Sequence, residues 1–256
     1  ITLLLVGLVP LVLTGWFLSE RSAVELRAVE GRYQTQLVQD KARQIEMFGQ
    51  RYNEMVKGIA KAFELTQDFS SLSSEQTQQK LGQTLKENPF LVTLYVKPIS
   101  GDPLSVFRAE WINEGEVEAL SQNLLGKIND KKLIWGRPQV LASSGEGVIT
   151  IAAPVVEGQN ISAAVIAVIS LREIGRIMAD AKPATEKELW ESGLPIIFVV
   201  NEMGNPIFHP DLEVVKSQKS LNDLRIVQEW KESSKQIQSA LVPFKAVYNN
   251  VEHEMI

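Results

Sequence analysis

The chain has 256 residues, of which 22% are charged and 45% hydrophobic, a composition typical of a folded globular protein rather than a disordered one. Its formal net charge of -5 and the lack of a basic patch in the sequence exclude nucleic acid as an expected partner. With no cysteine and two histidines, the sequence excludes disulfides, thiolate zinc sites, cysteine nucleophiles and multi-histidine metal centres. We therefore expect neither a metal nor a cofactor.

The chain opens with an uninterrupted apolar run, ITLLLVGLVPLVLTGWFL, without a charged residue. At about 1.5 Å per residue, a helix over this run nearly crosses a hydrocarbon core of roughly 30 Å. We predict a transmembrane helix over residues 1–18, with Trp16 at the membrane interface. A secretory signal peptide is the alternative, but the run exceeds a usual h-region and no small-x-small cleavage site follows it. Because the chain begins on Ile1, we expect the true N-terminus to lie upstream.

Residues 19–66 show helical periodicity without a proline. The apolar positions follow one another mostly at steps of three and four: Leu26, Val29, Tyr33, Leu37, Ile45, Phe48, Tyr52, Met55, Ile59 and Phe63. One interpretation is a helix that packs against its own domain, and the other is a stalk that pairs with a second subunit. We expect pairing into a homodimer in the membrane-near half and domain packing in the later half.

A first folded unit follows the polar break at Asp68–Ser74. A helix capped by Ser73 or Ser74 is predicted to run to Asn88. The remaining predicted elements are strands at Phe90–Val96, Leu104–Trp111, Ile134–Ala142, Gly147–Val156 and Ala163–Leu171, and helices at Gly115–Asn129 and Leu171–Ala179. Short strands joined by tight turns predict an antiparallel sheet.

A second unit is predicted after the polar linker Lys182–Glu188. Its expected elements are strands at Pro195–Val200, Pro206–His209 and Ala240–Tyr248, and a helix at Leu224–Ile237. These strands are too few to close a sheet, so we expect that the given sequence is cut within this unit.

Three stretches carry a resemblance to a known family. They are Ile149–Val155, which ends in Pro-Val, Ala163–Leu171, which ends in Ser-Leu, and Phe198–Asp211, which contains His-Pro-Asp. In this order, and after a long helix, they resemble the double Cache family of bacterial extracytoplasmic sensors. The resemblance implies an α+β fold: a transmembrane helix over 1–18, a stalk helix over 19–66, and two tandem PAS-like antiparallel-sheet units. The membrane-distal, ligand-binding unit would cover residues 67–181, and the incomplete membrane-proximal unit residues 182–256.

The same resemblance implies that residues 19–256 lie outside the cytoplasm, anchored in the bacterial inner membrane. It also implies a second transmembrane helix and a cytoplasmic output domain of the kinase, cyclase, phosphatase or chemotaxis type. Ligand binding in the distal unit would shift the helical stalk slightly.

The sequence departs from the family at two ligand contacts. Amino-acid-binding members carry an aspartate in the last distal strand, and Val168 occupies that position here. The family's Arg-x-Trp-Tyr clamp is absent, and Phe107–Trp111 is the nearest stretch. Because a buried ammonium needs a carboxylate partner, we do not expect an amino acid as the ligand.

Polar and aromatic residues on the distal sheet and its crossing segment are the candidate ligand-binding residues: Tyr95, Arg108, Trp111, Trp135, Arg137 and Ser143. On one strand, Trp135 and Arg137 would point to the same face. An indole beside a guanidinium suits an organic anion. The alternative is that Trp135 belongs to the core and Arg137 is a solvated edge residue. We assign His209 a structural role, in which it fixes a turn by hydrogen bonding.

Signatures of catalysis are missing from the sequence. There is no Gly-x-Ser-x-Gly elbow and no phosphate-binding glycine loop. We interpret the carboxylates of Glu110, Glu114, Glu116 and Glu118 as solvated acids at a helix start. We thus expect no enzyme in this segment but a sensor of small molecules. The alternative is a membrane-tethered dimeric scaffold, which differs in whether Arg108, Trp135 and Arg137 converge on a cavity.

Overall fold

The computed structural model describes residues 2–66, 74–99, 101–128, 132–178, 197–233, 244–248 and 251–255. For residues 2–11, 23, 27, 30, 66, 123, 212, 244–248 and 251–255 it describes the backbone alone. Two compact parts make up the chain: residues 43–223, and residues 1–42 together with 224–256.

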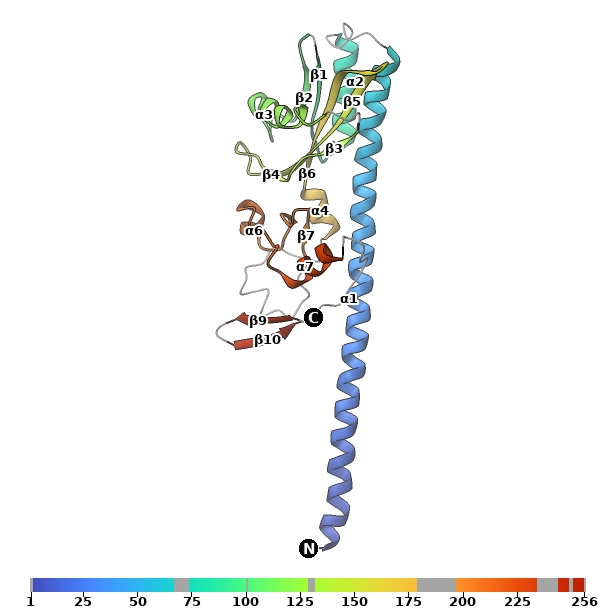
Figure 1. The fold of residues 1–256 in the computed structure, drawn as a ribbon, viewed down its shortest axis with the longest axis vertical. Helices are drawn as coiled ribbons and strands as arrows, with labels where there is room; N and C mark the ends of the chain where they lie inside the picture. Colours follow the sequence, from blue (N-terminus) through green and yellow to red (C-terminus); the bar gives the residue numbers. More distant parts are fainter. Residues whose placement is uncertain are drawn as a thin grey trace. The chain divides into compact units, whose positions relative to one another are not determined.

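The predicted long helix is present as α1, Thr2–Thr66 (Figure 1). In its later half, the residues buried in the core with the sheet are Phe48, Tyr52, Val56, Ala60 and Phe63. Steps of three and four bring these side chains to one face of the helix, so the predicted domain packing of this half is confirmed. In the earlier half, Leu26, Val29 and Tyr33 are 69%, 60% and 63% exposed.

The predicted membrane anchor covers residues 1–18, and the side chains of its first eleven residues lie outside the described part of the chain. Among the residues that the structure does describe, no helix is both long and apolar enough to cross a membrane. The anchor therefore stays a prediction.

One antiparallel sheet dominates the part formed by residues 43–223. Its strand order is β2-β1-β6-β5-β3, and β4 also pairs with β5. The strands are β1 (Leu91–Pro98), β2 (Leu104–Phe107), β3 (Ile134–Trp135), β4 (Gln139–Val140), β5 (Gly147–Glu157) and β6 (Asn160–Ser170). β5 and β6 form a long hairpin whose turn contains Gly158 at a φ of +60°, a conformation that glycine adopts without steric cost. The predicted antiparallel sheet is thus confirmed.

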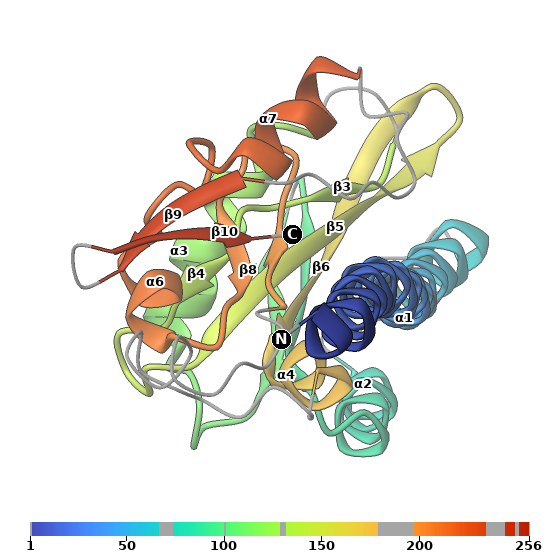
Figure 2. The same ribbon diagram turned by 90° about the horizontal axis from the view of Figure 1, so that it is seen from below.

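Helices cover both faces of this sheet (Figure 2). On one face, α1 and α2 (Glu75–Glu87) bury residues such as Tyr52 and Leu85 against Leu94, Ile151 and other apolar side chains of the strands. On the other face, α3 (Glu114–Leu125) buries a separate apolar cluster. The predicted cap of α2 is confirmed, because Ser74 accepts a hydrogen bond from the backbone N–H of Thr77.

Two predicted strands are shorter than expected. The strand predicted over 134–142 divides into β3 and β4, which both pair with β5, since Pro138 has no N–H for the ladder. Between them, the N–H of Gly136 donates to Thr150 O at 2.8 Å, and a Cβ on Gly136 would lie 2.0 Å from Thr150 Oγ1. The strand predicted over 104–111 ends at Phe107, because residues 109–111 form a turn.

The segment after β6 begins with α4 (Arg172–Ile177), at the place of the predicted exit helix. After residue 196 come the hairpin β7 (Val199–Val200) and β8 (Pro206–Phe208), and then α6 (Leu212–Lys216). The N–H of Asp211 donates to Nδ1 of His209 at 3.0 Å, which confirms the predicted turn-fixing role of the imidazole. Burial lowers the pKa of His209.

In the other part, α7 (Arg225–Glu232) occupies the predicted C-terminal helix, and β9 (Phe244–Tyr248) pairs with β10 (Val251–Met255). The predicted linker Lys182–Glu188, most of the polar break and the end of the predicted helix over 224–237 lie outside the described residues. The division into tandem units and the truncation of the second one stay predictions.

Candidate ligand-binding site

A row of three residues crosses the middle of the sheet on the side covered by α3. Val168 on β6 pairs with Thr93 on β1 and with Thr150 on β5. Residues directly opposite each other in an antiparallel sheet present their side chains to the same face. Val168 belongs to the cluster under α3, so both threonine hydroxyls lie there too. We call Thr93, Val168 and Thr150 the threonine row.

The hydroxyl of Thr93 is the polar atom that stands out in this row. Thr93 is fully buried, and its Oγ1 has no hydrogen-bond partner among the described residues. On α3, by contrast, the buried Ser121 hydroxyl donates to Val117 O at 2.7 Å. A buried hydroxyl without a partner costs about 1–3 kcal/mol, so Thr93 is suited to receive a polar group from a bound molecule.

The threonine row is covered from two sides. Gly136 lies directly over the Thr150 hydroxyl, with Leu124 of α3 beside it. Tyr95, two residues beyond Thr93 on β1, is 5% exposed and belongs to the same cluster. Burial, with a contribution from the Glu118 carboxylate, raises the pKa of Tyr95. The row therefore offers hydroxyl and methyl groups and no charge of its own.

Two positively charged side chains, Arg108 and Arg172, lie just after the ends of β2 and β6. The guanidinium carbons of Arg108 and Arg172 lie 5.9 and 5.2 Å from the ring centroid of Trp111. Arg108 also donates from Nε to Leu91 O at 2.9 Å. Its Nη2 reaches Leu85 O at 2.7 Å, so this side chain fastens the turn to β1 and α2.

Arg172 is paired with a buried carboxylate. Its Nη2 lies 2.6 Å from Oε2 of Glu146, which is 4% exposed and also accepts a hydrogen bond from the Ser170 hydroxyl. Positive charge at this edge of the sheet is thus partly neutralised within the protein.

Glu116 organises the neighbouring loop, which corrects the expectation that it is a solvated acid. Its Oε1 accepts from the N–H groups of Ala142 at 2.7 Å and Ser143 at 3.1 Å, while Oε2 is buried. Burial acts to raise the pKa of Glu116, but these hydrogen bonds outweigh it, so that the pKa lies below its ordinary value. The Ser143 hydroxyl in turn donates to Trp111 O at 3.1 Å.

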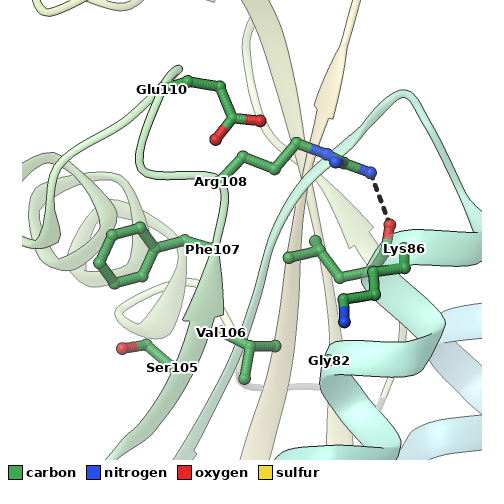
Figure 3. A pocket seen from close by; sticks show the side chains of 8 residues that line it. Gly82, Lys86, Ser105, Val106, Phe107, Arg108 and Glu110 are labelled. Carbon is green, nitrogen blue, oxygen red and sulfur yellow. Dashed lines mark hydrogen bonds between the residues drawn. The ribbon is translucent and has the colours of Figure 1, made fainter.

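An open groove of about 450 Å³ lies between α2 and the edge strand β2 (Figure 3). Its lining includes Gly82 and Lys86 from α2, Val106 from β2, and Arg108 and Glu110 from the following turn. Figure 3 shows the Arg108 side chain extending from the end of β2 to the C-terminal end of α2. Because its guanidinium donates hydrogen bonds to backbone carbonyls, Arg108 connects the two walls of the groove and stabilises them.

The predicted site residues fall into separate groups. Arg108, Trp111 and Ser143 lie together at the edge described above. Trp135 lies on the opposite side of the sheet, where its Nε1 donates to Oδ1 of Asn53 on α1 at 3.0 Å. The expectation that Trp135 and Arg137 share a strand face is wrong, because β3 ends at Trp135; Arg137 is exposed.

Sequence reasoning missed Thr93, Thr150 and Gly136, and it assigned Glu116 to the solvent instead of to the loop that it holds. The threonines carried a usable signal, since each is a single polar residue within an apolar strand, LVTLYV and VITIAA. Their pairing with Val168 depends on strand register, which the sequence did not specify.

No family model matches the sequence. No curated protein matches it either.

Among the solved structures that match the fold are sensory domains of chemoreceptors. The ligand-binding domain of the Pseudomonas aeruginosa amino-acid chemoreceptor PctC, in complex with GABA, has a TM-score of 0.55 and 17% identity, covering 84% of this chain and 87% of that chain. The sensory domain of the Campylobacter jejuni chemoreceptor Tlp3, with isoleucine bound, gives 0.56 and 13%, with 87% and 85% covered. The domain of Pseudomonas fluorescens CtaA with L-serine gives 0.53 and 15%, with 84% and 83% covered. The chain therefore has the fold of the Cache-type periplasmic sensory domains of bacterial chemoreceptors.

Proposed function

We propose that this chain is the extracytoplasmic ligand-sensing region of a membrane receptor, which transmits small-molecule binding to a cytoplasmic output domain. The observation that carries the proposal is the shared fold, which extends over more than four fifths of this chain and of each of the three sensory domains. We retain the predicted organisation of anchor, stalk, distal unit over 67–181 and incomplete proximal unit over 182–256.

The distal sheet is suited to this role because its two faces have different partners. The threonine row lies under α3, whereas α1 packs on the opposite face of the same strands. A ligand that moves the strands or α3 therefore acts on the layer against which α1 rests.

For the ligand we propose a small organic anion rather than an amino acid. The similar sensory domains of PctC, Tlp3 and CtaA hold GABA, isoleucine and L-serine, respectively. In this chain Val168 is fully buried between two threonines, so the row holds no carboxylate to pair with an ammonium group. The hydroxyl of Thr93 would accept or donate one hydrogen bond, and Arg108, which donates to backbone carbonyls and has no carboxylate partner among the described residues, would favour negative charge nearby.

A thermal-shift screen tests this function. The chain is heated with panels of organic acids, amines and amino acids, since a molecule that binds only the folded state raises its melting temperature. We expect a hit among the organic acids that Thr93→Val weakens and the exposed Lys57→Ala does not. A hit confined to amino acids would contradict the proposed ligand class, and the lack of any hit would count against sensing.

A dimeric, membrane-tethered scaffold is the second candidate. It is favoured by the exposed apolar side chains in the first half of α1 and by the separation of Arg108, Trp135 and Arg137, which do not meet at one place. Self-association without any ligand effect on the melting temperature would support the scaffold over the sensor.

A further inference from the structure

Three consecutive residues of α1 connect this helix to two separate elements. Arg51 Nη2 lies 2.5 Å from Glu173 Oε2, and the Tyr52 hydroxyl donates to the same oxygen at 3.1 Å. Asn53 accepts the hydrogen bond from Trp135 on β3. Within one turn, the helix thus contacts α4 through two side chains and β3 through the next.

The contact with β3 lies one residue from the threonine row. Trp135 is paired with Ile151 on β5, and Gly136 rests on the Thr150 hydroxyl at the other face. Successive residues of a strand face opposite sides of the sheet, so Trp135 lies on the α1 side and Gly136 on the α3 side. A displacement at Thr150 therefore reaches the indole that donates to Asn53 in two steps: the hydrogen bond from Gly136 N–H to Thr150 O, and the peptide bond between Trp135 and Gly136.

The contact with α4 is built on a buried charge. Glu173 is 5% exposed and stands in the first turn of α4, immediately after β6, the strand that carries Val168. A buried carboxylate is stable only with its partners in place, and α1 supplies both the guanidinium and the phenol. α4 also packs against the β7–β8 hairpin, where Phe208 lies 3.9 Å from the Cβ position of Gly175.

We propose that residues 51–53 of α1 form a transmission junction. Through these three residues, a change in the conformation of β3 beside the threonine row changes the position of α4, and the reverse. This inference rests on the proposed function, since it assigns the sensor its internal route from the site to the elements that lead out of the sheet. Coupling of this kind is reciprocal, so a change at α4 must also be felt at β3.

Backbone amide exchange in the 256-residue chain tests the junction without a ligand. Trp135→Phe keeps an aromatic ring but removes the donor to Asn53. We expect the amides of Gly175 and Met178, which close the turns of α4, to exchange at least threefold faster in this variant. Gln139→Ala, in the next short strand, is the matched control and leaves them within threefold of the wild type.

The reverse direction uses Glu173→Gln, which keeps the shape of the side chain and removes its charge. We expect the Gly136 amide, which donates to Thr150 O, to exchange at least threefold faster. The Val117 amide at the start of α3 is the internal control, and its exchange stays within threefold in every variant unless the whole part is destabilised.

A second pair of variants separates the effect of the lost hydrogen bond from a general loss of folding. Asn53→Asp keeps an oxygen acceptor for the indole and retains slow exchange in α4, whereas Asn53→Leu removes it and speeds exchange as Trp135→Phe does. Effects that stay next to each substitution, in both directions, would overturn the junction. A ligand hit with uncoupled exchange would reject the junction alone, and coupled exchange without any ligand would reject the sensor alone.

Discussion

At the scale of single residues, two buried oxygen atoms distinguish the α3 side of the sheet: Thr93 Oγ1, without a described partner, and Glu116 Oε2. Such atoms are rare in native cores, because each lost hydrogen bond to water needs a replacement. Their positions flank the cluster under α3, one in the sheet and one in the first turn of the helix.

Replacing Thr93 by valine tests the first of these atoms. The methyl that replaces the hydroxyl keeps the volume and removes an unpaired polar group, so we expect the free energy of unfolding to rise by about 1 kcal/mol. Urea denaturation measures the change, with Ser121→Ala as the control that loses a hydrogen bond and becomes less stable. A loss of stability in Thr93→Val would show that the hydroxyl is satisfied in solution.

Glu116 gives a pH-dependent prediction. Since the pKa of its carboxyl is lowered in the folded state, the carboxylate stabilises the fold above the unfolded pKa of about 4.3, and this contribution is lost as the pH falls through the lower folded value. Glu116→Gln should therefore lower the melting temperature at pH 7 and converge with the wild type in acid. Glu118→Gln, on the exposed side of the same helix, serves for comparison. Curves that stay parallel from pH 7 to pH 2 would refute this role.

At the scale of elements, the close approach of the chain to β5 just after β3 depends on one glycine, Gly136. Gly136→Ala places a methyl against the Thr150 hydroxyl, and we expect a loss of about 1–3 kcal/mol in the free energy of unfolding. Adding Thr150→Ala should restore part of it, because the obstructing oxygen is then gone. Gly126→Ala, with open space at its Cβ position, is the control. Equal effects of Gly136→Ala with and without Thr150→Ala would contradict the proposed clash.

The segment around Gly136 also shows which part of the fold the sequence could predict. β5 and β6 were predictable because each is a continuous apolar strand, long enough to span the sheet, with a glycine turn between them. The two-residue strands β3 and β4 were not, since their pairing is decided by Pro138 and by a contact of Gly136 with a strand distant in sequence. The same holds for the candidate site. Arg108 and Trp111 are close in sequence, so their proximity could be predicted, whereas Thr93 and Thr150 come together only because both strands pair with β6 at Val168.

At the scale of the whole molecule, exposed apolar side chains gather in the first half of α1, among them Val24, Leu26, Val29 and Tyr33. We propose that they hold two copies together, and Val29→Asp tests this because a charge in a paired helix seam is costly. We expect the dissociation constant of the dimer to rise at least tenfold, or about 1.4 kcal/mol, by sedimentation equilibrium. Val38→Asp carries the same change about half a turn away, on the opposite face of the helix, and should leave association unchanged. Similar dissociation constants for both variants would contradict pairing along this stripe.

Finally, α1 is tied to the sheet at two heights, which restricts how it can move. Besides the contacts of residues 51–53, Glu64 accepts a hydrogen bond from the N–H of Val156 at 3.1 Å. Thirteen residues, or about 20 Å of helix, separate Arg51 from Glu64. Sliding of α1 along its axis would have to break both sets of hydrogen bonds at once, so together they oppose a piston-like displacement of the packed half of the helix.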